Sequence, residues 1–547
     1  MKNNIYSFDV FDTCLVRLCG KPSNVFEILS EQISSILTLS EHQRQLFVSL
    51  RANTTGKSLQ EIYNKICQSI EITISPDTLV QMELVLEQEV LSPVEKISKL
   101  IKSLRKTGFI IFISDMYLPS NFIRQILIKY ELCDENDLIY VSCEQNASKY
   151  DASLFKKIKK ELKVSYSSWI HYGDNIISDY QIPSKLGIRC HLIKKEQLPY
   201  ETTIHNHFTP QFPFNSIVAG ISQGLHLRYY SLKPSPFVCD ISAPFIVSWV
   251  AKIMHDAEKK GITQLFFCAR DTHSAFLVAK KLNPLFPNIE IKYIFVSRVS
   301  LSKSSKLVFE YFKSVGITNT DKKSAIVDFV STGNTLRTIN TILTTNGHEP
   351  CHGYFILRIN YNTDNQYKDI QNTTISSYEI ETTYASLNNP QLTKYSFERI
   401  IFEIFFSLNY HKTTIDYNDT GRGIVPIFGN DDFHDKWSMP NVEEQKKIND
   451  AILLQYTEAF INCCLERYAS QIFDNIVLHV FERFINFPEK VYLEYLSDLQ
   501  INESRLISRI TPFSKTPNTL WRRGCLIYSL PKPLIEIYRK MTKAEKL

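Results

Sequence analysis

Near the beginning of the chain stands Ile5-Tyr6-Ser7-Phe8-Asp9-Val10-Phe11-Asp12-Thr13, and this stretch decides the fold. Its apolar residues predict a buried strand of a parallel sheet that stops on the carboxylate of Asp9. A second apolar run, Phe109-Ile110-Ile111-Phe112-Ile113, leads into Ser114 in the same way. Because open α/β sheets bind ligands beyond the carboxyl ends of their strands, we expect Asp9 and Ser114 to share one crevice.

Two later segments supply the charges that such a crevice needs. Lys149 precedes the apolar face of a predicted helix, where its ammonium can face an anion on Asp9. The stretch Trp169 to Asp179 predicts a strand followed by two acids, Asp174 and Asp179. Carboxylates held close together repel unless a cation lies between them. Hard oxygen ligands without His or Cys are typical of a Mg²⁺ site.

The motifs FDVFDT, SDMYLP and GDNIISD, in this order, resemble those of the haloacid dehalogenase (HAD) superfamily, and the resemblance covers about residues 1–195. The sequences of these motifs are similar to those of bacterial HAD hydrolases of the surface-polysaccharide-locus type. The resemblance implies a Rossmann-like core with a helical cap. It also implies a Mg²⁺-dependent hydrolase, above all a phosphatase that acts on a sugar phosphate through an aspartyl-phosphate, in capsule or surface-polysaccharide synthesis.

Each motif residue takes a role from this resemblance. Asp9 matches the nucleophile, Ser114 the hydroxyl that holds the phosphate, and Lys149 the charge stabiliser. Asp174 matches the Mg²⁺ ligand that works with Asp9, and Asp179 matches the acid that steadies the metal and lysine shell. These roles agree with covalent catalysis by a carboxylate and with electrostatic clamping of phosphoryl oxygens.

One position departs from the family pattern. Family phosphatases place a second Asp two residues after the nucleophile to protonate the leaving alkoxide, and this chain has Phe11 there. Asp12 is a candidate substitute, and a leaving group acidic enough to need little help is another solution. The alternative interpretation is a catalytically silent HAD-fold binding or regulatory protein. Taken singly, each acid is also typical of a turn or helix cap.

The insertion after Thr13 has helical apolar spacing and predicts a helical cap over the crevice, at about residues 18–91. In the resemblance this cap closes over the substrate and excludes water. The stretch Ser92-Pro93-Val94-Glu95 predicts the start of the next helix, with Ser92 as its N-cap. Gly108 predicts the end of that helix.

The chain as a whole predicts an α/β protein of several domains. Residues 1–195 form the HAD-like domain, and the proline-punctuated stretch 196–240 is expected to be a linker. Apolar runs that end in polar residues predict a second α/β domain at 241–430. Helical spacing predicts a helical C-terminal region at 431–547.

The second domain contains a motif of its own at the end of an apolar strand. Asp328 is followed by a turn that opens a helix and suits a phosphate, Ser331-Thr332-Gly333-Asn334-Thr335. The motif resembles the phosphoribosyl-pyrophosphate (PRPP) loop of type I phosphoribosyltransferases. In that resemblance Asp328 holds the ribose hydroxyls and the turn cradles the 5-phosphate, although Phe329 replaces the usual second acid. An ordinary capped turn is the alternative.

The two motifs together suggest that the second domain transfers phosphoribose from PRPP to a glycan precursor and that the HAD domain then removes the 5-phosphate.

The composition of the chain argues against other classes of protein. With 547 residues, 44% of them hydrophobic, the chain can bury several cores. A formal net charge of +5 without a basic block argues against a nucleic-acid surface. Short apolar runs argue against membrane insertion, and 12 scattered cysteines suit a reducing cytoplasm.

Overall fold

The structure is a computed structural model, and it divides into two compact units. Unit 1 comprises Met1–Ser235 with Ala459–Arg467, and unit 2 comprises Pro236–Glu458 with Tyr468–Leu547. The structure describes residues 4–70, 73–194, 213–269, 271–303, 305–331, 333–358, 380–382, 412–429, 437–438, 441–486, 488–498, 500–501, 504–505, 522–531 and 534–535.

Unit 1 is built on a parallel five-stranded sheet with the order β5-β4-β1-β6-β7. Its strands are β1 Asn4–Asp9, β4 Gly108–Ser114, β5 Leu138–Val141, β6 Trp169–Gly173 and β7 Arg189–Leu192. Around them lie α5 Glu95–Leu104, α6 Ser120–Lys129, α7 Ser142–Gln145, α8 Ser153–Leu162, the short turn η1 Tyr166–Ser168, the π-helical turn η2 Ile176–Gln181 and α9 Ile182–Lys185. The predicted α/β class is therefore confirmed.

The sheet register brings the motif residues to one edge. In β1 and β4, Asp9 pairs with Ile113, so Asp9 and Ser114 end neighbouring strands. On the other side of β1, strand β6 ends at Gly173, directly before Asp174. The core beneath this edge is apolar and includes Phe155 and Trp169, both fully buried. Each such side chain stabilises the folded state by about 2 kcal/mol, which holds the edge in place.

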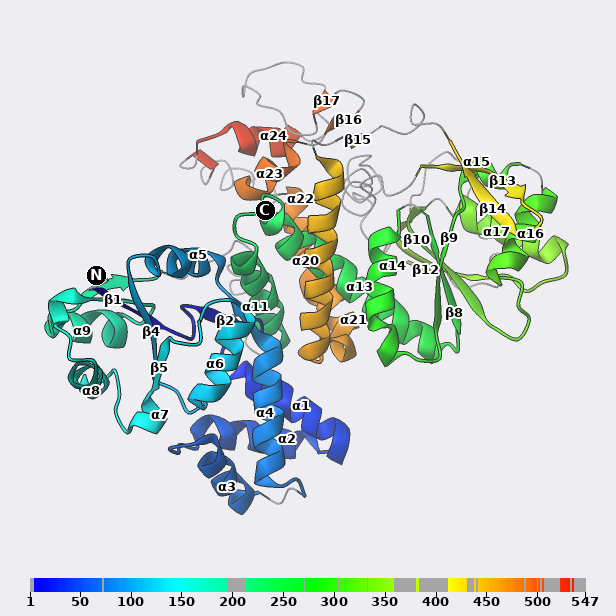
Figure 1. Cartoon of the computed structure of the whole chain (residues 1–547). Coiled ribbons are helices and arrows are strands. Elements are labelled where there is room, and N and C mark those ends of the chain that lie inside the picture. The colour runs from blue at the N-terminus through cyan, green and yellow to red at the C-terminus, as the bar shows by residue number, and fades with distance from the viewer. Residues whose placement is uncertain are drawn as a thin grey trace. The chain divides into compact units, whose positions relative to one another are not determined.

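The cap is a group of four helices, shown in blue in Figure 1. They are α1 Asn24–Leu37, α2 Glu41–Asn53, α3 Leu59–Ser69 and α4 Pro76–Val90. Serine side chains at Ser40, Ser58 and Ser75 cap α2, α3 and α4, as the helix-capping preference predicts. The chain enters and leaves the cap through one antiparallel pair, β2 Leu15–Arg17 with β3 Leu91–Pro93.

The predicted helix start at Ser92 is wrong. Ser92 lies in β3, where it pairs with Val16, and the helix begins at Glu95 without a side-chain cap. The strand pairing takes up the residue that the capping pattern assigned to the helix. The helix ends at Leu104, and Gly108 is instead the first residue of β4.

Two further segments belong to unit 1. Helix α11, Pro213–Arg228, lies within the stretch expected to be a linker. It approaches the chain after β2 so closely that a Cβ on Gly220 would meet the backbone of Gly20. The second segment is Ala459–Arg467, whose Arg467 Nη1 lies 3.8 Å from Glu31 Oε2 of the cap.

Unit 2 contains a second parallel five-stranded sheet, with the order β12-β11-β10-β8-β9. Its strands are β8 Gln264–Cys268, β9 Glu290–Ile294, β10 Ser324–Ser331, β11 His352–Arg358 and β12 Ile380–Thr382. The direction of strand order changes between β8 and β10. Doubly wound sheets bind ligands at such a switch point, beyond the carboxyl ends of the strands.

Helices and short strands complete unit 2. The helices are α12 Ser235–Phe237, the π-helical turn η3 Val238–Ser242, α13 Ala243–Lys259, α14 His273–Leu282, the short turn η4 Asn283–Leu285, α15 Arg298–Leu301, α16 Ser305–Val315, α17 Asn334–Thr345, α20 Val442–Asn462, the short turn η8 Leu465–Tyr468, α21 Ala469–Ile472, the π-helical turn η9 Phe473–Val477, α22 Leu478–Asn486, α23 Lys490–Leu496 and α24 Arg522–Ser529. Three of these elements cross the boundary between the units, because α12 and η8 begin, and α20 ends, within unit 1. The strands are β13 Thr414–Asp419, β14 Ile424–Phe428, β15 Trp437–Ser438, β16 Gln500–Ile501 and β17 Ser504–Arg505.

One helical segment among the described residues, Ser235–Lys259, has the length and apolarity of a membrane span. Its most apolar window is 94% buried inside the structure, which is the environment of a core helix.

Candidate active site

A buried lysine joins two carboxylates at the carboxyl edge of the unit 1 sheet. Lys149 Nζ lies 2.5 Å from Asp9 Oδ1 and 2.6 Å from Asp179 Oδ1. Lys149 is 3% exposed and Asp9 is 6% exposed, so solvent hardly screens these ion pairs. Burial alone would lower the pKa of Lys149, but the two carboxylates raise it above its ordinary value. Lys149 is therefore a permanent cation in this site.

A chain of hydrogen bonds behind the lysine fixes Asp179. Trp169 Nε1 donates to Ser7 Oγ at 2.7 Å, and Ser7 Oγ lies 2.6 Å from His171 Nδ1. His171 Nε2 lies 3.2 Å from Asp179 Oδ1. Burial lowers the pKa of His171, and the chain is complete when a neutral ring carries its proton on Nε2. Burial acts to raise the pKa of Asp179, but His171 and Lys149 lower it to about 2.

The backbone around Asp179 leaves no room for adjustment. A Cβ on Gly173 would lie 2.5 Å from Cβ and Cγ of Asp179, so this position requires glycine. The backbone N–H of Asn175 donates to Asp179 Oδ2 at 3.1 Å. The Asn175 side chain in turn accepts from the N–H groups of Ile177 and Ser178 at the start of the π-helical turn. Both oxygens of Asp179 are thus held by donors of the protein.

Asp9 and Asp174 are the residues that fit a metal ion. One oxygen atom from each of Asp9, Asp174 and Asp179 lies within 4.8 Å of the others. Burial, followed by Asp179 and Asp174, raises the pKa of Asp9 to about 7 although Lys149 opposes it, and burial and Asp12 raise that of Asp174. Among the described residues, the second oxygens of Asp9 and Asp174 accept no hydrogen bond. A hard divalent cation between the carboxylates of Asp9 and Asp174 would relieve their repulsion, so the donor set suits Mg²⁺.

Ser114 and its neighbour Asp115 lie at the carboxyl end of β4 and have different roles. Ser114 is 2% exposed, and its hydroxyl makes no hydrogen bond within the described part of the chain, which leaves it free for a substrate oxygen. Asp115 Oδ1 accepts from the backbone N–H of Lys149 at 2.9 Å, and Asp115 Oδ2 accepts from Ser148 Oγ at 2.8 Å. Asp115 therefore fixes the loop that carries the lysine.

Phe11, which stands where family phosphatases have a second Asp, contacts a buried arginine. The Arg17 guanidinium carbon lies 4.7 Å from the centre of the Phe11 ring. Asp12 adopts the left-handed conformation with φ 58°, which is uncommon for a residue other than glycine. Its carboxylate is near enough to raise the pKa of Asp174. The next residue, Thr13, donates from Oγ1 to Asp174 Oδ1 at 3.3 Å.

The structure thus brings Asp9, Asp174, Asp179 and Lys149 together and places Ser114 on the neighbouring strand end, with the Asp12 carboxylate within electrostatic range of Asp174. No role was predicted from the sequence for Asp115, Ser7 or His171. The signal for the last two was present, because each is a polar residue inside an otherwise apolar strand and they pair across β1 and β6. A polar pair in such strands indicates a buried hydrogen bond.

The second predicted site lies on β10 and α17 of unit 2. Asp328 is half-buried on β10, and Gly333 has φ +81° where α17 begins. Among the described residues outside the turn and helix α17, nothing lies within 4 Å of the position of a Gly333 Cβ, although Gly333 itself is buried. Asn334 Oδ1 accepts from Arg337 Nη1 at 2.9 Å, and Thr335 is half-buried. Thr332 and the side chain of Ser331 lie outside the described residues.

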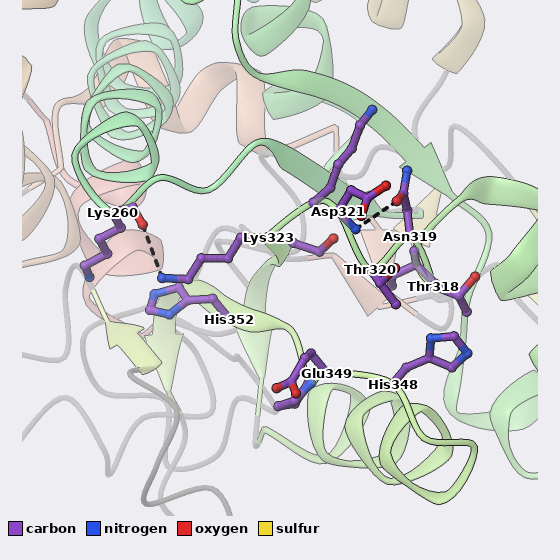
Figure 2. Close-up of a pocket in the computed structure, with 13 residues that line it drawn as sticks. Lys260, Thr318, Asn319, Thr320, Asp321, Lys323, His348, Glu349 and His352 are labelled. Carbon is purple, nitrogen blue, oxygen red and sulfur yellow. Dashed lines mark hydrogen bonds between the residues drawn. The ribbon is translucent and has the colours of Figure 1, made fainter.

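Unit 2 also has a cavity of about 640 Å³ at the opposite ends of the strands (Figure 2). It is lined by Lys260, by the loop that leads to Ser324 at the start of β10, and by the segment from His348 to His352 at the start of β11. Lys323 Nζ donates to the backbone carbonyl of Lys260 at 3.2 Å. This cavity is separate from the predicted phosphate turn, because β10 runs between the two.

The fold and the first site define an α/β protein with a buried carboxylate–lysine centre of the kind that suits phosphoryl transfer. No protein-family model matches this sequence, and neither does any curated protein. Among solved structures, a HAD family enzyme of Bacteroides thetaiotaomicron in complex with magnesium and inorganic phosphate is 15% identical, with a TM-score of 0.26. That match covers 35% of this chain and 94% of the other.

Two further solved structures are similar to the same extent. A HAD phosphatase of Thermococcus onnurineus is 16% identical, with a TM-score of 0.27 and coverage of 35% of this chain and 87% of that one. A magnesium-bound putative HAD-hydrolase of Bacillus subtilis is 16% identical, with a TM-score of 0.26 and coverage of 34% and 87%. At these identities and TM-scores, the case for a function rests on the geometry of the site itself.

Proposed function

We propose that unit 1 is a Mg²⁺-dependent phosphohydrolase of the HAD type that forms an aspartyl-phosphate on Asp9. The observation that carries the proposal is the Lys149 bridge between Asp9 and Asp179 beside Asp174. Lys149 occupies only Oδ1 of Asp9, which leaves the second oxygen to act as a nucleophile. The substrate class that we propose is a sugar phosphate or a related phosphorylated metabolite, handled in the cytoplasm during surface-polysaccharide synthesis.

The residues divide the reaction into two steps. The free oxygen of Asp9 attacks phosphorus, the bond from phosphorus to the leaving oxygen breaks, and the alkoxide takes a proton from Asp12 or from water. Water then attacks the phosphorus of the aspartyl-phosphate, and inorganic phosphate leaves as the Asp9 carboxylate reforms. Lys149 and the Ser114 hydroxyl offset charge on the phosphoryl oxygens in both steps. Bound Mg²⁺, held by Asp9 and Asp174, would add Lewis-acid stabilisation of that charge.

The test is phosphate release from a panel of sugar phosphates with and without Mg²⁺. We expect metal-dependent turnover by the wild-type protein, no turnover by Asp9→Asn, and a phosphoenzyme that is labile to hydroxylamine. Asp321→Asn, in the cavity of Figure 2, is the matched control and should behave as the wild type. Turnover that survives Asp9→Asn would contradict the mechanism.

A second candidate function is a binding or regulatory protein that has lost turnover. The observation that favours it is Phe11, whose ring is covered by Arg17 at the place where family phosphatases carry an acid. Phosphate, Mg²⁺ and beryllium fluoride would then still bind, because the groups that contact them are intact. Binding measured by calorimetry, together with no release of phosphate from any substrate, is the result that selects this function.

For unit 2 we propose a phosphate-binding turn at Gly333, with Asp328 positioned to bind ribose hydroxyls of PRPP. The support is the left-handed glycine turn at the carboxyl end of β10, at the start of α17 and next to the switch point of the sheet. Incubation with PRPP and a pool of glycan acceptors should release pyrophosphate. An Asp328→Ala protein that released pyrophosphate equally fast would overturn this role, and Asp321→Ala is the control.

A further inference from the structure

Two buried arginines connect the cap to the loops of the active site. Arg17 donates from Nε and Nη2 to the carboxylate of Glu87 at 2.8 to 3.1 Å. Arg51 donates from Nε and Nη2 to the carboxylate of Glu83, both at 2.7 Å. All four side chains are at most 4% exposed. Glu83 and Glu87 are four residues apart, so they share one face of α4.

Each guanidinium also lies on an aromatic ring of an active-site loop. Arg17 covers Phe11, two residues after Asp9, at 4.7 Å. Arg51 lies 4.6 Å from the ring centre of Tyr117, three residues after Ser114. A single cap helix therefore reaches both loops through two carboxylate–guanidinium–aromatic contacts. Such contacts are strong when they are desolvated, and the planar guanidinium fixes their geometry.

Two further side chains contact the Arg51–Glu83 pair. Tyr63 Oη donates to Glu83 Oε2 at 2.5 Å, and Phe26 lies against Arg51 with 4.4 Å from its ring centre to the guanidinium carbon. Two cations and two anions balance, so the cluster offers no free charge to a substrate phosphate. Its chemistry suits fixing neighbouring groups rather than binding an anion.

We propose that Arg17 and Arg51 are positioning residues through which α4 fixes the loops of Asp9 and Ser114 for reaction. When the cap is seated, Glu87 holds Arg17 on Phe11 and Glu83 holds Arg51 on Tyr117. Phe11 then serves as the contact of the cap with the nucleophile loop, which gives a reason for a ring where an acid is expected. This inference rests on the proposed phosphohydrolase function.

The experiment compares two pairs of substitutions on the full chain with Mg²⁺ present. Arg51→Met with Glu83→Gln removes the guanidinium and keeps an acceptor for Tyr63. Its matched control is Arg44→Met with Glu31→Gln, an ion pair between α2 and α1 of the cap. We expect kcat to fall by about 10- to 100-fold in the first pair, because small misplacements of reacting groups cost that much. KM and the control should change by less than about 2-fold on the same reasoning.

Hydrogen exchange provides a readout that does not depend on turnover. Amides at 115–118 should exchange faster in the first pair than in the control, and those in α8 should not change. If exchange at 115–118 and kcat both match the control, the inference is overturned. If exchange rises but the wild-type protein hydrolyses no phosphate, the proposed function fails and the positioning contact stands.

A second comparison separates the ring of Tyr117 from its hydroxyl. Tyr117→Phe keeps the face that Arg51 covers and should retain the wild-type kcat. Tyr117→Leu removes that face and should lose as much kcat as the first pair. Equal losses in the two variants would show that the hydroxyl matters instead, and they would overturn the role of the ring.

Discussion

At the scale of single residues, Lys149 depends on neighbours that lie far away in the sequence. Asp115 orients its backbone, and His171 and Ser7 orient the Asp179 carboxylate that it binds. None of these supports requires contact with a substrate. Substitutions behind the site should therefore change its activity through geometry alone.

Gly173 offers the sharpest test of this dependence. Gly173→Ala places a methyl group 2.5 Å from the Asp179 side chain, so Asp179 must move away from Lys149. We expect phosphate release to fall at least 10-fold and the free energy of unfolding to fall by about 1 to 3 kcal/mol. Gly56→Ala in the cap is the control, with 3.0 Å or more to its nearest atoms. Wild-type activity in Gly173→Ala would show that Asp179 tolerates displacement.

The buried His171 predicts a pH dependence of stability. Burial lowers its pKa below the ordinary 6.5, so between the folded and unfolded pKa values the unfolded chain binds more protons. Stability from this group is fully present above pH 6.5 and is lost as the pH falls through the folded pKa, at up to about 1.4 kcal/mol per pH unit. Urea unfolding at pH 5 to 8 should show this slope, and His171→Gln should flatten it. Parallel slopes in the two proteins would contradict the prediction.

At the scale of elements, long apolar strands could be predicted and short edge strands could not. The strands that carry Asp9, Ser114 and Asp174 are buried runs that stop at polar residues, and that pattern is strong in the sequence. Strands β5 and β7 have four residues each, with two buried residues in β5 and none in β7, so both are too short to give a clear pattern in the sequence.

In the cap, the helices could be predicted from the sequence, but the burial of two charged residues could not. Helical spacing predicts the helices, but the usual preference places Glu83 and Glu87 on a solvated face. They are buried because arginines from α2 and β2 neutralise them. Partners separated by 32 and 70 residues cannot be matched from one sequence. The convergence of the motif acids could be predicted because parallel strands align their ends.

The turn before α17 gives a prediction for an element of unit 2. Gly333 has φ +81°, and a Cβ there would meet no atom within 4 Å among the described residues outside the turn and helix α17, so backbone strain is the expected cost of a side chain. Gly333→Ala should lower the free energy of unfolding by about 1 kcal/mol. Gly333→Asn should cost less, because Asn tolerates the left-handed region. Denaturant unfolding measures both, and an Ala variant as stable as the wild type would show that the turn adopts another conformation.

At the scale of the whole molecule, a metal that binds one unit should stabilise that unit alone. If Mg²⁺ binds at Asp9 and Asp174, a concentration of 100 times its Kd adds about 2.7 kcal/mol to the folded state of unit 1. Differential scanning calorimetry of the full chain should show a shift of one transition and no shift of a second. Asp174→Asn should abolish the shift, whereas a shift of both transitions would place the metal elsewhere.

The segment Ala459–Arg467 sets an order of events during synthesis. Its flanking residues belong to unit 2, yet the segment belongs to unit 1, where Arg467 approaches Glu31. A ribosome that has made residues 1–235 has therefore not yet delivered every part of unit 1. The cap meets its last neighbour only after most of unit 2 has been translated. A gene cut after residue 235 would yield a product that lacks this contact, so dissection of the protein should retain the later segment.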